Sequence, residues 1–347
     1  MSKAVAGFPI SEIVLPGVVG TGGLIRRDRN LPRPGAGRAI VRVEASGISF
    51  AERAMRRGRY PGQPKFPFVP GYDLVGIVVA VGADADAGWC GTRVAVLTKT
   101  GGWATHANVS VDDLLPVPDA VSPAEVETLV VNGITAWQML HREARVAAGQ
   151  TILVHGANGG VGTNLVQLAK HAGVRVIGSA SPRHHDALRA LGVEPVDYDD
   201  PDFAARVRLL APLGVDAVFD HIGGASVSRS YRLLTPRGTL VSYAMASSLR
   251  ETTPMIPQFF RLLANLMWWN ALPNGRKAVF YNIWQGRHTR PKTFRANLRR
   301  DFAKLMEMLV DGVLTPHIAA RFPLDDVGAA MELAESGTVH GKIVLTP

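Results

Sequence analysis

A glycine-rich segment at residues 155–162, His-Gly-Ala-Asn-Gly-Gly-Val-Gly, constrains the fold of this chain more than any other feature. It follows the apolar run Thr151–Val154 and opens an amphipathic segment, Val161–Ala172. A strand that enters a helix through such a turn is typical of a dinucleotide phosphate site. Glycines let the backbone approach a pyrophosphate, and the helix N-terminus offers unpaired N–H groups. Because the glycines at 156, 159 and 162 depart from the usual G-x-G-x-x-G spacing, the prediction rests on their place between strand and helix.

Strand-like and helix-like segments then alternate along the chain, separated by short glycine or proline breaks. The pattern predicts strands at 174–179, 195–197, 215–220 and 238–243, and helices at 183–191, 202–210 and 225–234. Such alternation is typical of a doubly wound parallel sheet with helices on both faces. The sequence therefore predicts an α/β fold with a Rossmann domain.

The end of the second predicted strand indicates which nicotinamide cofactor would bind. NAD-specific sites carry an acid about 20 residues past the first glycines, where it holds the ribose 2′-hydroxyl. Here the chain reads Ser179-Ala-Ser181-Pro-Arg183-His-His, and the first acid is Asp186. Hydroxyls, a guanidinium and imidazoles suit a 2′-phosphate, so the segment favours NADPH. The alternative interpretation is an ordinary solvated helix start with a serine cap.

Length and amino-acid composition limit the classes of protein to which this chain can belong. The chain of 347 residues is long enough for about two domains. Cys90 is its one cysteine, so neither a disulfide framework nor a cysteine zinc cluster is expected. The N-terminus lacks the pattern of a signal peptide, and we expect a soluble, cytoplasmic protein.

The formal net charge of +9 is spread along the chain, and no aromatic-interleaved basic strip predicts nucleic-acid binding. One denser group of arginines stands just ahead of Tyr60, where it is a candidate for steering an anionic, carrier-bound substrate. Its members are Arg53, Arg56, Arg57 and Arg59.

The first 125 residues differ from the following part, because alternating segments such as Ala39–Ala45 are separated densely by glycine and proline. That pattern indicates a compact domain rich in β-strands. Within it, Phe68-Val-Pro-Gly-Tyr-Asp-Leu-Val-Gly76 resembles the P-G-x-E/D-x-x-G segment of the medium-chain dehydrogenase/reductase superfamily. Further segments match that superfamily in order; they include 91–94, 102–104, 132–137, 220–224 and 341–345.

The resemblance is to the zinc-independent quinone oxidoreductase (zeta-crystallin-like) branch, and residues 242–245 with the apolar insert resemble vesicle amine transport protein homologues. It implies a GroES-like catalytic domain from residues 1–125 and 291–347, with the Rossmann domain inserted at 126–290. It also implies a homodimer that pairs through an edge strand at Lys277–Tyr281, since an exposed strand edge has a physical reason to pair.

The cofactor residues follow from the loop and the resemblance together. Glycines of the loop would hold the pyrophosphate, polar residues near 180 would hold the adenosine phosphate, and the others come from the resemblance alone. The full predicted set is Gly156, Asn158, Gly159, Gly160, Val161, Gly162, Ser179, Ser181, Arg183, Tyr198, Asn132, Thr135, Tyr243 and Lys342.

Three positions argue against the catalytic zinc that many members of the superfamily use. By resemblance, the zinc cysteine, histidine and second cysteine fall on Ser49, Tyr72 and Val131. Two hydroxyls and a valine do not make a Zn²⁺ site. Hydride addition to a conjugated C=C or a quinone remains feasible, because one hydrogen-bond donor to the developing enolate supplies about 3 kcal/mol.

The candidate donors are Tyr60, Ser49 and Tyr72. Tyr60 matches the position of the proton-donor tyrosine in related enoyl thioester reductases, and a phenol is protonated at neutral pH. The alternative is that the Tyr60 ring only packs against its loop. Ser49-Phe50 departs from the asparagine that quinone reductases typically carry one step from a phenylalanine here, so quinone specificity does not transfer directly from the resemblance.

The apolar stretch after residue 255 repeats at helical spacing, with Phe259, Leu262, Leu263, Leu266 and Met267 on one stripe. Core or dimer packing, a lid over an apolar substrate, and a membrane-surface contact all stay open. The function that the sequence predicts is an NADPH-dependent, zinc-independent reductase of quinones or α,β-unsaturated carbonyls. The alternatives are reduction of a specific biosynthetic or carrier-bound intermediate, and an NADPH-binding membrane-peripheral adaptor without turnover.

Overall fold

A computed structural model describes residues 7–249 and 255–347 of the chain. The chain forms two compact units: unit 1 comprises Met1–Ile134 with Lys292–Pro347, and unit 2 comprises Thr135–Pro291. The boundary falls inside helix α3 (Val131–Trp137), whereas the sequence placed it at residue 125.

Unit 2 contains a six-stranded sheet in which all neighbouring strands are parallel, in the order β10-β9-β8-β11-β12-β13. This confirms the predicted doubly wound fold. Its strands are β8 (Thr151–His155), β9 (Arg175–Ala180), β10 (Glu194–Asp197), β11 (Val215–Asp220), β12 (Leu234–Ser242) and β13 (Lys277–Phe280).

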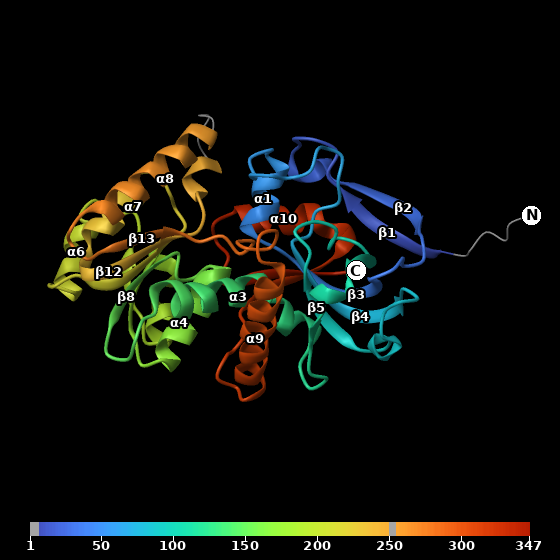
Figure 1. Ribbon diagram of the computed structural model, residues 1–347. Helices are drawn as coiled ribbons and strands as arrows, with labels where there is room; N and C mark the ends of the chain where they lie inside the picture. Colours follow the sequence, from blue (N-terminus) through green and yellow to red (C-terminus); the bar gives the residue numbers. More distant parts are fainter. Residues whose placement is uncertain (1–6, 250–254) are drawn as a thin grey trace, which may run out of the picture. The chain divides into compact units, whose positions relative to one another are not determined.

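Helices cover both faces of this sheet (Figure 1), because each crossover returns on the side that strand twist allows. Along the chain these helices are α4 (Gly160–His171), α5 (His185–Ala190), α6 (Phe203–Leu210), α7 (Ala225–Arg232) and α8 (Met255–Ala271). The last three contribute to one core beneath them, which includes Phe203, Tyr231 and Leu262. α7 ends at Arg232, two residues before the predicted limit, because Leu234 already belongs to β12.

Unit 1 is rich in β-structure, as predicted. Its main sheet has seven strands, in the order β14-β15-β3-β4-β5-β7 with β6 also paired to β3, and β1 pairs with β2 in a separate antiparallel ribbon. The strands are β1 (Phe8–Val14), β2 (Ile25–Leu31), β3 (Arg38–Ile48), β4 (Asp73–Val81), β5 (Arg93–Leu97), β6 (His106–Ser110), β7 (Leu115–Pro116), β14 (Ile318–Pro323) and β15 (Lys342–Thr346).

In the described part of unit 1, these strands are accompanied by α1 (Phe50–Arg56), α2 (Pro123–Glu127), α9 (Pro291–Val310) and α10 (Val327–Glu335), besides the first residues of α3. β15 lies between β14 and β3, so a strand from the end of the chain completes a sheet that begins in the first 50 residues. Within the described residues, no helix has the length and apolar character needed to cross a membrane.

Candidate functional site

The glycine loop of unit 2 has the geometry of a phosphate cradle. Gly156 follows β8 with φ of +64°, a left-handed conformation that side chains disfavour, and Gly159 caps the first turn of α4. A Cβ on Gly162 would overlap the carbonyl oxygen of Gly156 and lie 2.8 Å from Ala157 Cα. The turn is therefore as tight as the strand, loop and helix sequence predicted, and its closeness depends on glycine at 162.

A buried polar network supports the floor of this loop. The His155 ring contacts the Ser179 hydroxyl at 3.0 Å from Nδ1 and the Ser230 hydroxyl at 3.0 Å from Nε2. Ser230 and Ser226 each donate to Asp220 Oδ2 at 2.8 Å. Burial lowers the pKa of His155, so its imidazole is neutral and able to accept as well as donate. The network ties the ends of β8, β9 and β11 together beneath the loop.

Asp220 also stabilises the turn that follows β11. Its Oδ1 accepts hydrogen bonds from the backbone N–H groups of Ile222 at 2.8 Å and Gly223 at 3.1 Å. Burial favours the protonated carboxyl, yet these N–H and hydroxyl donors and the neighbouring His155 lower the pKa of Asp220 below its ordinary value. Sequence reasoning quoted Asp220 only as part of a motif and missed this supporting role.

The residues predicted for the adenosine phosphate end separate into two groups. Ser179 is buried, and its hydroxyl is engaged with His155 inside the fold. Ser181, Arg183 and Tyr198 follow the carboxyl ends of β9 and β10, where Arg183 Nε donates to Ser181 Oγ at 3.2 Å and the Tyr198 side chain is 53% exposed. The exposed group offers hydroxyls and a guanidinium together at one edge of the sheet.

The remaining predicted cofactor residues lie in several places. Asn132 and Thr135 are buried on α3, on either side of the boundary between the units. Tyr243 follows β12, where burial and the neighbouring Asp220 carboxylate raise the pKa of its phenol, which stays protonated. The others form the loop and first turn already described; they are Asn158, Gly160 and Val161.

Unit 1 brings two of the three candidate donors together. The hydroxyls of Tyr60 and Tyr72 are 2.6 Å apart, and their rings meet edge to face with centroids 5.9 Å apart. Tyr72 is buried, and its backbone N–H donates to Glu52 Oε1 at 2.6 Å. The two phenols thus form a hydrogen-bonded pair at the position that resemblance assigned to a zinc histidine.

Ser49 is the N-cap residue of α1. Its hydroxyl accepts from Ala51 N at 3.1 Å and also contacts Glu52 Oε2, while its backbone N–H donates to Glu52 at 2.8 Å. This reciprocal capping box satisfies N–H groups that a helix start leaves open. A hydroxyl held in this way is a poorer substrate donor than the tyrosine pair.

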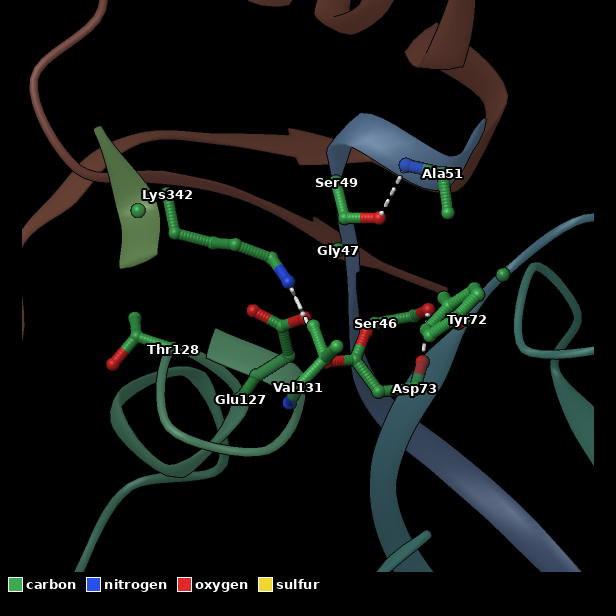
Figure 2. A network of polar contacts seen from close by, with 12 residues as sticks. Ser46, Gly47, Ser49, Ala51, Tyr72, Asp73, Glu127, Thr128, Val131 and Lys342 are labelled. Atoms are coloured by element: carbon green, nitrogen blue, oxygen red, sulfur yellow. Dashed lines mark hydrogen bonds and ion pairs between the residues drawn. The ribbon is translucent and has the colours of Figure 1, made fainter. Parts of the chain in front are cut away.

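A buried ionic cluster lies beside these residues, and the sequence did not predict it. Lys342 Nζ lies 3.0 Å from Glu127 Oε1 and 3.4 Å from Asp73 Oδ2, and Asp73 Oδ2 also accepts from Val131 N at 2.9 Å. Figure 2 shows Lys342 reaching from β15 toward Glu127, with Asp73 beyond. A Cβ on Gly47 would lie 2.7 Å from Glu127 Cδ, so a glycine makes room for the carboxyl group.

The pKa values of Glu127, Glu52 and Lys342 are displaced from their ordinary values. Burial raises the pKa of Glu127 well above its usual value, and burial together with Asp73 raises the pKa of Glu52. Burial alone would lower the pKa of Lys342, but Asp73, Glu127 and Glu52 raise it. Lys342 was predicted to bind the cofactor; the structure engages its ammonium with two carboxyl groups, and the cofactor role stays a prediction.

The zinc-ligand positions do not offer a metal site. Ser49 caps a helix, Tyr72 pairs with Tyr60, and Val131 presents a backbone N–H to Asp73. In the part of the chain that the structure describes, no three His, Cys, Asp or Glu side chains are arranged to hold a metal ion. The donor chemistry of these residues therefore does not fit zinc.

The arginine group ahead of Tyr60 is used inside the fold. Arg56 is buried and its guanidinium lies 2.6 Å and 2.8 Å from the two oxygens of Glu335, which also binds Arg57 at 2.7 Å. These contacts account for two of the four arginines and weaken the hypothesis that the group steers an anionic substrate.

Family models match most of the chain. A model described as alcohol dehydrogenase GroES-like domain matches residues 35–119, and one described as zinc-binding dehydrogenase matches residues 191–345. The human synaptic vesicle membrane protein VAT-1 homolog is 33% identical over 326 residues, which cover 91% of this chain and 80% of that protein.

Solved structures show the same fold over almost the whole chain. The mycobacterial protein Rv1454c, solved in complex with NADPH, is 30% identical with a TM-score of 0.82, and the match covers 97% of this chain and 100% of that one. The human VAT-1 homolog-like protein is 25% identical with a TM-score of 0.81 and 98% of each chain covered. The two units thus occur together in these proteins.

Proposed function

This chain belongs to the medium-chain dehydrogenase/reductase superfamily, with VAT-1 homologues among its relatives, and we propose that it is a zinc-independent, NADPH-dependent reductase of quinones or α,β-unsaturated carbonyls. The observation that carries the proposal is the hydrogen-bonded Tyr60–Tyr72 hydroxyl pair, which lies where the resemblance to zinc-dependent members assigns a metal-ligating histidine. Without a Lewis acid, an enolate or quinol oxyanion is a more accessible intermediate than the alkoxide of an unactivated ketone.

The glycine loop fits NADPH, because glycines at 156 and 162 permit the tight turn that brings backbone N–H groups at the N-terminus of α4 close to a pyrophosphate. We assign the 2′-phosphate to Ser181, Arg183 and Tyr198, which share one exposed edge. When bound, NADPH would supply the hydride. The complex of Rv1454c with NADPH supports this choice of cofactor.

The chain's own part in the chemistry is to hold a proton near the substrate oxygen. Tyr60 OH is the proposed donor, and Tyr72 OH, 2.6 Å away, orients it and stabilises charge that develops on it. The Tyr72 backbone is fixed by Glu52, whose raised pKa reflects its burial beside Asp73. A phenol so held donates a hydrogen bond to a developing oxyanion without first reorganising.

The proposal is tested by mixing the purified protein with NADPH and a panel of quinones and conjugated enones while following the absorbance of NADPH. We expect consumption with at least one class and none with saturated ketones. If no member of the panel is reduced above the background rate, the proposed function is wrong.

Cofactor preference gives a sharper test. Replacing Arg183 with alanine should raise KM for NADPH roughly tenfold or more, because a charge-assisted hydrogen bond to the 2′-phosphate is lost. KM for NADH should not change. Arg175→Ala is the matched control, since Arg175 begins β9, the strand that precedes Arg183, and pairs with Glu194 at 2.6 Å. Equal losses with both cofactors would place Arg183 outside the phosphate site.

The tyrosine pair predicts two unequal effects. Tyr60→Phe should lower kcat by roughly 100-fold, the usual cost of one oxyanion donor. Tyr72→Phe leaves that donor in place and should lower kcat by about threefold to tenfold, the worth of one neutral hydrogen bond. Single-turnover kinetics at saturating NADPH measure both, and KM for NADPH should stay unchanged. A Tyr60→Phe protein with full kcat would remove Tyr60 from the reaction.

We also propose a homodimer through β13. Residues 277–280 form one edge of the six-stranded sheet, and an unpaired edge presents backbone groups that a second copy can satisfy. Replacing Val279, which follows Ala278 in this strand, by proline should shift the mass measured by light scattering from dimer to monomer.

A further inference from the structure

The strand order of unit 2 reverses between β8 and β11. From β8 the chain continues to β9 and β10 toward one edge of the sheet, and from β11 it continues to β12 and β13 toward the other. In open parallel sheets, ligands bind in the crevice that such a reversal leaves at the carboxyl ends of the strands. Its walls here are the loop that begins at Gly156 and the turn after Asp220, and a Cβ on Gly156 would lie 2.5 Å from the His221 ring. The spacing of these walls therefore sets the width of the crevice.

Asp220 and Ser230 fix the place of one proton on the buried His155 ring. Burial raises the pKa of Asp220, but His155 and the surrounding N–H and hydroxyl donors outweigh it, so the carboxylate is ionised and only accepts hydrogen bonds. The Ser230 hydroxyl donates its proton to Asp220 Oδ2 at 2.8 Å. Its oxygen, 3.0 Å from His155 Nε2, can then only accept from the ring, so Nε2 carries a hydrogen.

The opposite ring nitrogen has the complementary role. Burial lowers the pKa of His155 and Arg229 lowers it further, against the Asp220 carboxylate whose Oδ2 lies 3.9 Å from Nε2, so the ring is neutral and Nδ1 carries no proton. Nδ1 therefore accepts from the Ser179 hydroxyl at 3.0 Å. The Ser179 oxygen accepts in turn from the Gly156 backbone N–H at 3.4 Å. An unbroken chain of hydrogen bonds thus runs in one direction, from the backbone of the glycine loop to Asp220.

Each end of this chain holds the backbone of one crevice wall. One end is the glycine loop itself, and at the other end Asp220 Oδ1 accepts from the N–H groups of Ile222 and Gly223. Between them the His155 ring lies against the ring of Phe203, a residue of the core of unit 2, with centroids 5.5 Å apart. The imidazole is therefore held by packing as well as by its two hydrogen bonds.

We infer that His155 is a positioning residue for the dinucleotide: as the tautomer with its hydrogen on Nε2, it aligns the glycine loop with the turn after β11. An imidazole suits this place because one rigid ring accepts at one nitrogen and donates at the other. The inference rests on the proposed NADPH site, since only a ligand that lies along both walls needs their spacing fixed. A ligand confined to the adenosine phosphate end, at the carboxyl ends of β9 and β10, should not depend on it.

Two serines of α7 provide a matched pair of variants. Ser230 and Ser226 are both buried and both donate to Asp220 Oδ2 at 2.8 Å, but only Ser230 belongs to the chain through His155. In calorimetric titrations, Ser230→Ala should raise the dissociation constant for NADPH about tenfold, because the His155 donor loses its acceptor, and Ser226→Ala by less than about threefold. Adenosine 2′,5′-bisphosphate, which lacks the nicotinamide half, should bind both variants as it binds the parent. A general loss of folding would weaken both ligands alike.

A double-mutant cycle tests whether the ring transmits the effect. Ser179 and Ser230 contact opposite nitrogens of His155, so the double variant Ser179→Ala, Ser230→Ala should raise the dissociation constant for NADPH by less than the product of the two single effects. His155→Gln keeps one acceptor and one donor group and should bind NADPH at least about threefold more tightly than His155→Leu.

The tautomer is measured on the parent chain without any substitution. Nitrogen NMR of histidine-labelled protein distinguishes a hydrogen on Nε2 from one on Nδ1, and the spectrum of His155→Gln identifies the His155 signals. A hydrogen on Nδ1, equal NADPH losses in the two serine variants, or independent effects in the cycle would overturn the inference while NADPH binding and the proposed function stand. A parent chain that binds no NADPH would overturn both.

Discussion

Replacing Gly162 with alanine is expected to raise the dissociation constant for NADPH roughly 5-fold to 150-fold. The added Cβ would overlap the carbonyl oxygen of Gly156 and press on Ala157 at 2.8 Å, so the loop must open. Overpacking of this kind costs about 1–3 kcal/mol, and here the shift falls on the backbone that approaches the pyrophosphate. Calorimetric titration with NADPH measures the loss directly.

Two controls separate a damaged cradle from a damaged fold. Gly35→Ala adds a Cβ with nothing within 4 Å and should bind NADPH as the parent does. Circular dichroism should show that Gly162→Ala keeps its helix and strand content. If the folded Gly162→Ala protein binds NADPH with unchanged affinity, the loop is not the pyrophosphate site.

Replacing Lys342 with methionine is expected to lower the free energy of unfolding at pH 7 by about 3–5 kcal/mol, the usual cost of breaking a buried ion pair. The change leaves Asp73 and Glu127 buried without their cation, 3.4 Å and 3.0 Å from where Nζ had been. Lys304→Met is the control. Lys304 pairs with Glu307 at 2.6 Å on the surface, where such a pair contributes about 0–1 kcal/mol.

The deficit of Lys342→Met should shrink as pH falls from 8 to 5. Burial raises the pKa of Glu127 and Glu52 in the folded state, so the folded chain holds more protons than the unfolded chain above the ordinary carboxyl pKa. Stability therefore falls as pH rises through this window, and more steeply without the ammonium. Denaturant unfolding at several pH values measures the trend; a deficit independent of pH would show that lost packing, not charge, causes it.

The fold of unit 2 was predictable because local signals agree with one another. β8 and β11 carry short apolar runs, Ile152–Val154 and Ala217–Phe219, and the loop between β8 and α4 needs glycines that the sequence shows directly. The pairing of the strands then follows from the handedness of the crossovers.

The ionic cluster was not predictable, since its members come from distant parts of the chain. Asp73 begins β4, Glu127 ends α2 and Lys342 begins β15, and no periodicity links them. The capping role of Ser49 was not predictable for a related reason: in the sequence, a hydroxyl at a ligand position cannot be told from a hydroxyl at a helix cap, and Glu52 completes the capping box only in the structure.

The sequence predicted only part of the packing of α8. The sequence showed the inner stripe, but Met267 was assigned to it, whereas the structure leaves this side chain 75% exposed with Trp268. A helix with apolar residues on two faces does not reveal from spacing alone which face packs against the core.

The place of β15 in the sheet of unit 1 has a consequence for synthesis. A ribosome makes all of residues 135–291 before it reaches Lys342. The inserted unit is therefore complete before Asp73 and Glu127 can form ion pairs with the Lys342 ammonium. Domains form in the order in which their residues emerge. The unit that contains the glycine loop is therefore expected to fold first, and the sheet of the unit that carries the tyrosine pair is completed last.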